Sequence, residues 1–209
     1  MRYQRRIGQF NVVAECAEDL EEQAIGLLTK LDELNKVGPA IQDGTTIMFG
    51  WSLLTLRGDV DELVICEPDF ERDPFHDSLP QVEHTLRILI QQVALLKLIG
   101  AEGLEARFQD KVVIAKGALG TERIYLDRTA TDADSDSGWF IGEVEGRKSK
   151  YTVEELEAIY VYQIFQIRRA LMKVLALPPG YMVVFRGDNI EAIFDADTLV
   201  CSGLPPESG

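Results

Sequence analysis

The sequence predicts an α+β fold in which largely antiparallel sheets pack against three main helices. Apolar residues recur three and four positions apart in three long segments, which is the period of a helix buried on one face. Between these segments lie short runs rich in β-branched and aromatic residues, separated by turns too short for parallel connections. The order of the elements allows two lobes, residues 1–105 and residues 106–209.

The first lobe is expected to begin with a helix that is followed by a hairpin. Leucine and alanine residues at helical spacing predict this helix over residues 17–37, and the Gly-Pro pair at residues 38–39 ends it. Residues 45–56 and 62–67 are rich in Thr, Ile, Val and Leu and have Gly and Asp between them. This pattern predicts two strands joined by a tight turn.

A second helix is predicted after an acidic loop. Ser78 and Gln81 have the spacing of a capping box, in which the two side chains satisfy the first backbone N–H groups of a helix. Pro80 falls in the first turn, where a missing N–H costs little. The apolar stripe then continues to Gly100, where the helix is expected to end.

The second lobe is expected to contain a third helix with strands on both sides. Thr152 and Glu155 form a second capping box, which predicts a long helix over residues 152–177. The last ten residues are expected to form a loose tail. The predicted strands are short apolar runs at residues 112–115, 123–127, 138–142, 181–185 and 190–194.

The charge of the protein restricts its partners. Its 35 acidic and 21 basic residues give a net charge of −14. Binding to nucleic acid or to anionic lipid needs clustered Lys and Arg, so we expect neither partner. No segment has enough uncharged apolar residues to span a membrane, and no apolar run follows the basic start, so we expect no signal peptide. A basic protein remains compatible with this charge.

The cysteines and histidines predict no metal site and no bound cofactor. The three cysteines form no paired motif, and the two histidines do not complete a zinc spacing with them. Small buried hydrophobic residues are the simplest interpretation of such cysteines. Unpaired cysteines are typical of a reducing compartment, so we expect a cytoplasmic protein.

One acidic segment has the spacing of a calcium loop. Asp132, Asp134 and Asp136 occupy positions one, three and five, and Glu143 occupies position twelve. Position six is Ser137, although the sharp turn there needs glycine, and a strand follows where a calcium loop leads into a helix. We expect a solvated acidic loop, and a calcium-binding module remains an alternative function.

Catalysis by acidic loop residues is another alternative. A small hydrolase or transferase could use pairs of carboxylates for acid–base work. The sequence has no Gly-x-Ser-x-Gly elbow and no phosphate-binding glycine loop. A pairing of Cys66 with His84 is conceivable in space, but the spacing does not support it. Carboxylate pairs occur by chance in so acidic a chain, so they identify no active site.

Four segments of the second lobe resemble a known family. They are the Val-Val-Ile-Ala-Lys strand at 112–116, the Arg-Ile-Tyr-Leu-Asp-Arg strand at 123–128, Asp-Ser-Gly-Trp at 136–139 with Phe-Ile-Gly-Glu after it, and Leu-Pro-Pro-Gly-Tyr at 177–181. Over roughly residues 110–195 the chain resembles the immunity-protein domain of bacterial polymorphic toxin systems, the family numbered thirty-three. Residues 1–105 resemble nothing that we can name.

The resemblance implies a non-catalytic protein that binds a cognate toxin or secreted effector and protects the cell that makes it. The family has no catalytic residues to transfer to this chain. The resemblance implies structural roles for Asp136, Gly138 and Trp139, with Gly138 at the strand entry and Trp139 in the core. Contacts to the toxin vary in such systems, so they have to be inferred from other features.

Acidic loops are the expected partner-binding surface. An acidic protein approaches a basic toxin faster through electrostatic steering. Residues 59–77 hold eight acids and one base, Arg72, together with two phenylalanines that could act as apolar anchors. The predicted contacts are Asp69, Phe70, Glu71, Asp73, Phe75, Asp132, Asp134 and Asp136.

Overall fold

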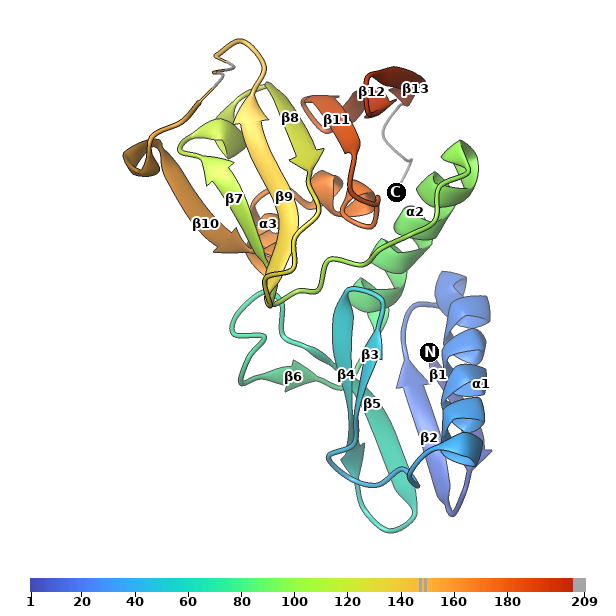
Figure 1. Ribbon diagram of the computed structural model, residues 1–209. Helices are drawn as coiled ribbons and strands as arrows, with labels where there is room; N and C mark the ends of the chain where they lie inside the picture. The colour runs from blue at the N-terminus through green and yellow to red at the C-terminus, as the bar shows by residue number, and fades with distance from the viewer. Residues whose placement is uncertain (147, 149, 205–209) are drawn as a thin grey trace. The chain divides into compact units, whose positions relative to one another are not determined.

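The computed structural model describes residues 1–146, 148 and 150–204 of the chain (Figure 1). The chain divides into two compact units, Met1–Ile90 and Gln91–Gly209. Each unit contains one mixed sheet, mostly antiparallel, together with helices, which confirms the predicted α+β class. The domain boundary expected between residues 105 and 106 lies inside the second unit.

The first unit contains a six-stranded sheet in the order β1-β2-β5-β4-β3, with β6 paired to β5. All neighbours are antiparallel except β2 and β5. The predicted hairpin is confirmed by the antiparallel pairing of β4 with β5. The strands are β1 (Arg2–Ile7), β2 (Phe10–Glu15), β3 (Thr46–Phe49), β4 (Ser52–Gly58), β5 (Glu62–Pro68) and β6 (Ser78–Leu79).

The first helix lies where the apolar stripe predicted it. After a 3₁₀ turn, η1 (Glu18–Leu20), α1 runs over Glu21–Val37 and contacts β1 and β2. Ala24, Leu27 and Leu31 of the stripe are almost fully buried in the core between helix and sheet. The helix therefore buries one face and leaves its charged face to solvent.

Two features of the first sheet differ from the sequence prediction. Residues 45–56 form two strands instead of one, because Gly50 adopts a φ of +58° and turns the chain back between β3 and β4. The strands β1 and β2 were not predicted. Three arginines interrupt β1, which lies at the edge of the sheet, so the usual apolar pattern is absent there.

The second helix begins later than predicted. Helix α2 covers Glu83–Ile99, whereas Ser78 lies in the short strand β6 and Pro80 precedes the helix. The capping box of Ser78 and Gln81 is therefore wrong. The side chain of Glu67 on β5 accepts the first backbone N–H groups of the helix instead, as described below. Because this cap comes from a distant strand, the local pattern could not indicate it.

The second unit contains a seven-stranded sheet in the order β10-β7-β9-β8-β11-β12-β13. All neighbours are antiparallel except β7 and β9. The five predicted strands of this half are confirmed. The strands are β7 (Lys111–Ala115), β8 (Arg123–Arg128), β9 (Asp136–Glu143), β10 (Leu156–Tyr160), β11 (Tyr181–Arg186), β12 (Asn189–Asp195) and β13 (Thr198–Leu204); a 3₁₀ turn, η2 (Ala118–Gly120), lies between β7 and β8.

The predicted long helix over residues 152–177 is wrong. The capping box of Thr152 and Glu155 is present, but it closes only a 3₁₀ turn. Strand β10 follows and pairs with β7, because this segment supplies the edge of the sheet. Its apolar residues suit a strand and a buried helix equally, so periodicity alone could not separate the two. The helical parts are η3 (Val153–Glu155), α3 (Val161–Ile167) and η4 (Arg169–Val174).

The end of the chain continues the sheet. The predicted hairpin of β11 and β12 is confirmed, and β13 pairs with β12 over Thr198–Leu204. The expectation of a loose tail from residue 200 is therefore wrong for residues 200–204. Residues 205–209 lie outside the described part of the chain.

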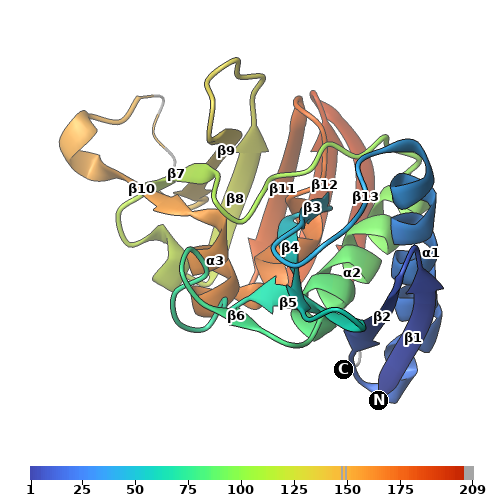
Figure 2. The same cartoon turned by 90° about the horizontal axis from the view of Figure 1, so that it is seen from below.

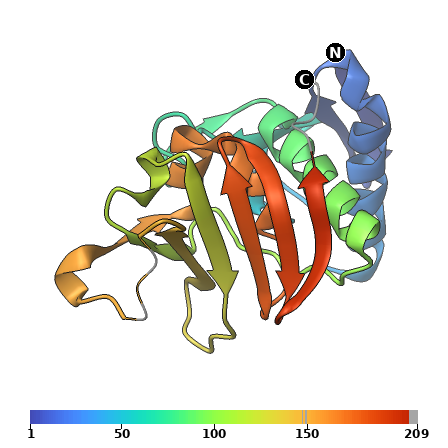
Figure 3. The same ribbon diagram turned by 90° about the horizontal axis from the view of Figure 1, so that it is seen from above.

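The helical segments of the second unit lie on one face of its sheet. The indole of Trp139 on β9 donates a hydrogen bond to the Leu175 carbonyl just after η4, which fixes this face as the core. Figure 3 shows the orange-red strands in front of the orange helical segment, with no helix of this unit on the viewer's side, and Figure 2 gives the opposite view. The other face of the sheet is therefore open.

Candidate functional site

The Asp-Ser-Gly-Trp segment forms the entry to strand β9. The Asp136 carboxylate accepts a hydrogen bond from the Gly138 backbone N–H at 2.9 Å. The Ser137 hydroxyl donates to the Lys111 carbonyl at 2.7 Å and accepts from the Trp139 N–H at 3.2 Å. These contacts shape the backbone and hold β9 beside β7. The segment therefore has a structural role, which is to fix the entry of strand β9 into the sheet.

Gly138 is required by the backbone geometry. It has a φ of +74°, and a Cβ atom added there would lie 2.2 Å from the Thr129 carbonyl oxygen. That carbonyl belongs to the main chain and cannot move aside as a flexible side chain could. The Thr129 N–H also donates to the Gly138 carbonyl at 3.0 Å. Only glycine allows the two backbones to approach so closely.

Arg128 ties this strand entry to the rest of the second unit. The residue is 3% exposed, and the centre of its guanidinium lies 5.6 Å from the Trp139 ring centroid. Burial lowers the pKa of Arg128 to about 10 because a charge is costly away from water. Its N–H groups donate to four backbone carbonyls at 2.5 to 3.2 Å, those of Leu104, Ser137, Leu175 and Leu177.

The aspartates of the calcium-like loop are not gathered around a common point. Asp132 and Asp134 are exposed before β9, whereas Asp136 binds its own backbone as described above. Asp134 and Asp136 line a surface hollow of about 480 Å³ together with Arg107. Among the described residues, no group of three or more His, Cys, Asp or Glu side chains is arranged to hold a metal ion.

Two of the predicted contact residues lie inside the first unit. Phe70 is 1% exposed and stacks on Trp51 with a centroid distance of 4.3 Å. It is a core residue and cannot anchor a partner in this conformation, so its prediction as a contact is corrected. Asp69 is 7% exposed, and its carboxylate accepts a hydrogen bond from the Glu71 N–H at 3.2 Å. Both residues therefore stabilise the conformation of the loop and do not form its outer surface.

The other predicted residues of this loop are exposed or partly exposed. The Asp73 carboxylate lies 2.8 Å from Nδ1 of His76 and accepts a hydrogen bond from the Phe75 N–H at 3.1 Å. The hydrogen bond with His76 holds the pKa of Asp73 below its ordinary value. Phe75 is 45% exposed, and Glu71 is also exposed. The acidic and aromatic character expected of the loop surface is therefore present.

The strongest candidates for acid–base chemistry serve as a helix cap. Glu67 is fully buried at the N-terminus of α2, where Oε2 accepts from the Thr85 N–H at 2.8 Å and Oε1 accepts from the His84 N–H at 3.2 Å. Nδ1 of His84 also lies 3.0 Å from Oε1. The Cys66 thiol contacts the Val64 carbonyl at 3.7 Å, and burial raises the pKa of that thiol. A thiol with a raised pKa is a weak nucleophile near neutral pH.

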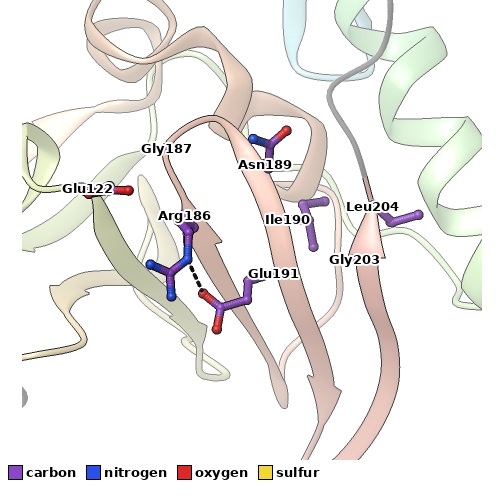
Figure 4. Close-up of a pocket in the computed structure, with 8 residues that line it drawn as sticks. All are labelled: Glu122, Arg186, Gly187, Asn189, Ile190, Glu191, Gly203 and Leu204. Atoms are coloured by element: carbon purple, nitrogen blue, oxygen red, sulfur yellow. Dashed lines mark ion pairs between the residues drawn. The ribbon is translucent and has the colours of Figure 1, made fainter.

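A wide hollow of about 630 Å³ lies where strands β11, β12 and β13 meet (Figure 4). Its polar lining includes Glu122, Arg186 and Glu191, and Nε of Arg186 lies 3.4 Å from Oε2 of Glu191. Glu191 also forms a bidentate ion pair with Arg123 at 2.5 and 2.8 Å. The Glu191 carboxylate of this hollow is therefore already paired with two arginines.

The open face of the second sheet is an apolar surface that sequence reasoning did not identify. We use the name open face for the side chains of β7, β8, β9 and β11 that point away from the helical segments. Aromatic rings pack across it, with centroid distances of 5.8 Å between Tyr125 and Phe140 and 5.3 Å between Phe140 and Tyr151. Tyr125 is only 5% exposed beneath these contacts, and the partly exposed central members are Val113, Asp127, Phe140, Met182 and Val184.

The alternation along β8 could have indicated this face. Ile124 and Leu126 are fully buried and face the helical segments, so Tyr125 and Asp127 face the other way. A Cβ atom at Gly142 would lie 2.7 Å from the Tyr125 ring, so this ring lies flat on the neighbouring strand. An apolar residue at an outward position of a central strand is the signal that was available in the sequence.

Comparison with known proteins identifies the second unit. A family model, described as the Imm33-like domain, matches residues 91–196, which is about half of the chain. No curated protein and no solved structure matches the sequence. None of the helices in the described part of the chain has the length and hydropathy needed to cross a membrane. The match agrees with the family that the Asp-Ser-Gly-Trp segment suggested, and the chain belongs to the Imm33-like immunity-protein family.

Proposed function

We propose that the protein is a non-catalytic immunity protein, which binds a cognate bacterial toxin or secreted effector and neutralises it in the cytoplasm of the producing cell. The observation that carries the proposal is the family match over residues 91–196, which spans most of the second unit. An immunity protein acts by binding, so its function needs a stable interface instead of reactive groups. The use of Glu67 and His84 as a buried helix cap is consistent with that role.

The charge of the protein supports a basic partner. A net charge of −14 attracts a cationic toxin over distances up to about the Debye length, roughly 8 Å at physiological salt. We propose that exposed acidic residues speed the encounter, with Phe75 as an apolar contact beside them. The carboxylates of Asp69 and Asp136 accept hydrogen bonds from nearby backbone N–H groups, so they contribute only their negative charge to the encounter. The residues in question are the exposed Glu71, Asp132 and Asp134 and the partly exposed Asp73.

Co-expression with the adjacent gene product tests the proposal. We expect the toxin encoded beside this gene to stop growth when expressed alone and to be tolerated when this protein is present. The two purified proteins should form a complex that survives size-exclusion chromatography. An unrelated toxin of the same activity serves as the control and should not be neutralised. Continued toxicity together with the absence of a complex would contradict the proposal.

A further inference from the structure

A carboxylate lies in the middle of the open face without a balancing cation. Asp127 is partly buried on β8, one of the central strands of the seven-stranded sheet. Its cross-strand neighbours are Phe140 on β9 and Met182 on β11, and its neighbour along β8 on the same face is Tyr125. Within residues 1–146, 148 and 150–204, no hydrogen bond or ion pair reaches the Asp127 carboxylate.

This carboxylate favours a partner that brings a cation. A partner that covered Asp127 without supplying a cation or a hydrogen-bond donor would remove water from a carboxylate that apolar neighbours cannot compensate. Glu191, another carboxylate near this face, already pairs with Arg123 and Arg186. Asp127 therefore provides the charge that a binding partner can complement.

We propose that the open face is the docking surface for the cognate toxin, and that the toxin places a Lys or Arg side chain against Asp127 within an apolar contact. The inference rests on the proposed function and identifies the surface that performs it. Charged residues enclosed by aromatic and aliphatic groups are typical hot spots, because the surrounding contacts exclude water from the ion pair. The partly exposed ring of Phe140, the cross-strand neighbour of Asp127, would also favour a cation there.

The size of the face suits a protein partner. The open face is the central four-stranded part of a sheet whose seven strands, spaced about 4.8 Å apart, are roughly 29 Å wide and, at five to eight residues each, roughly 16 to 26 Å long. The resulting area, on the order of 500 to 750 Å², approaches the roughly 800 Å² that each protein contributes to a standard interface. A second copy of this chain is a poorer occupant, because it would bring another Asp127 and another charge of −14.

The affinity of variants for the toxin tests the surface. The probe is the toxin domain encoded beside this gene, made inactive by mutation, and calorimetry measures its Kd. We expect Asp127→Asn to weaken binding roughly 10- to 100-fold and Asp127→Arg to weaken it further. The matched controls are Asp197→Asn and Asp197→Arg, which make the same charge changes in the exposed turn between β12 and β13 and should alter Kd less than about threefold.

The stability of the variants separates a binding role from a structural one. Because no hydrogen bond or ion pair of the described residues reaches the Asp127 carboxylate, Asp127→Asn should unfold at the same denaturant concentration as the wild-type protein or at a higher one. Rescue of Asp127→Arg by a Lys→Glu or Arg→Glu change in the toxin would support a direct ion pair. Hydrogen exchange in the wild-type complex should show protection of β8, β9 and β11.

The outcomes distinguish this surface from the proposed function. If the wild-type protein binds and protects, and the Asp127 variants bind equally well, the docking surface is wrong and the proposed function stands. If the wild-type protein neither binds nor protects, both are wrong. Sedimentation experiments compare the wild-type protein with Asp127→Arg. If the wild-type protein is a dimer, the variant is a monomer and both bind the toxin equally well, the face contacts a second copy and the proposal is overturned.

Discussion

The guanidinium of Arg128 lies over the indole of Trp139 in the interior of the second unit, 5.6 Å from the ring centroid. The two residues are 3% and 1% exposed. Both also donate hydrogen bonds to the Leu175 carbonyl, at 3.2 Å and 3.1 Å. A charged side chain thus takes the place of a hydrophobic one, and it satisfies carbonyls that lie beyond the end of η4. This pair therefore gives both residues a structural role in the interior of the second unit.

Replacing Arg128 should destabilise the protein strongly. Arg128→Met keeps most of the volume but removes the donor from four backbone carbonyls, of which that of Leu175 keeps the Trp139 indole, and each lost hydrogen bond costs about 1 kcal/mol. We expect the free energy of unfolding, measured in urea, to fall by about 2 to 4 kcal/mol. The control Arg186→Met removes an arginine with a largely exposed side chain and should cost less than about 1 kcal/mol. Equal losses in both variants would contradict this role of Arg128.

Replacing Gly138 tests the strand entry. Gly138→Ala forces a Cβ atom to within 2.2 Å of the Thr129 carbonyl oxygen, so the backbone must separate. We expect a loss of roughly 3 kcal/mol or more in thermal or urea unfolding. The control Gly187→Ala also has a positive φ, +56°, but has no atom within 4 Å, so it should cost only about 1 kcal/mol. Similar losses of stability at both positions would mean that the positive φ of Gly138, and not its close approach to the Thr129 carbonyl, causes the loss.

Removing the buried cap of α2 should also destabilise the protein. Glu67→Ala leaves the buried Thr85 N–H and the His84 N–H without their acceptor, so we expect a loss of roughly 2 to 4 kcal/mol. Glu33→Ala removes an exposed glutamate of α1 and should change the stability by about 0.5 kcal/mol or less. Hydrogen exchange should accelerate at the start of α2 in Glu67→Ala. Unchanged exchange at that point would argue against the cap.

Acidification should weaken the ion pair between Glu191 and Arg123. The hydrogen bonds from Arg123 hold the pKa of Glu191 below its ordinary value of 4.5, so the unfolded chain takes up this proton first as the pH falls. The stabilisation is therefore complete above about pH 4.5 and is lost as the pH falls through the lower value in the folded protein.

The variant Glu191→Gln provides the measurement. We expect it to be less stable than the wild-type protein at pH 7, by about 0.5 to 1 kcal/mol, and to approach the wild-type stability as the pH falls through the lowered pKa of Glu191. Asp197→Asn, at an exposed turn after β12, is the control and should show no such convergence. A constant difference between Glu191→Gln and the wild-type protein at all pH values would contradict the assignment.

The first helix and the strands of the second half were predictable because their signals are local. The stripe of Ala24, Leu27 and Leu31 has helical spacing and ends at a Gly-Pro pair, and a helix buried on one face needs nothing more. Strand β10 was mistaken for a helix for the opposite reason. Its capping box and apolar residues suit a helix, and only pairing with β7 selects the extended conformation.

The candidate site was only partly predictable. The alternation of Ile124, Tyr125, Leu126 and Asp127 identifies two faces of a strand, but it does not say which face the helical segments cover. Phe70 shows the same limit of sequence reasoning. An aromatic residue in an acidic loop is predicted to be exposed, and only the structure shows that Phe70 stacks on Trp51. Exposure depends on which elements pack together, and that information is spread over the whole chain.

The sequence by itself determined the α+β class, the excess of negative charge and the family. These follow from local periodicity, from composition and from a short segment whose backbone needs Gly138. Only the tertiary structure decided that Glu67 caps α2, that Arg128 holds Trp139, and that Asp127 lies without a cation on an apolar face. The physical reason is that burial and charge balance depend on residues distant in the sequence, whereas periodicity and turns depend on neighbours.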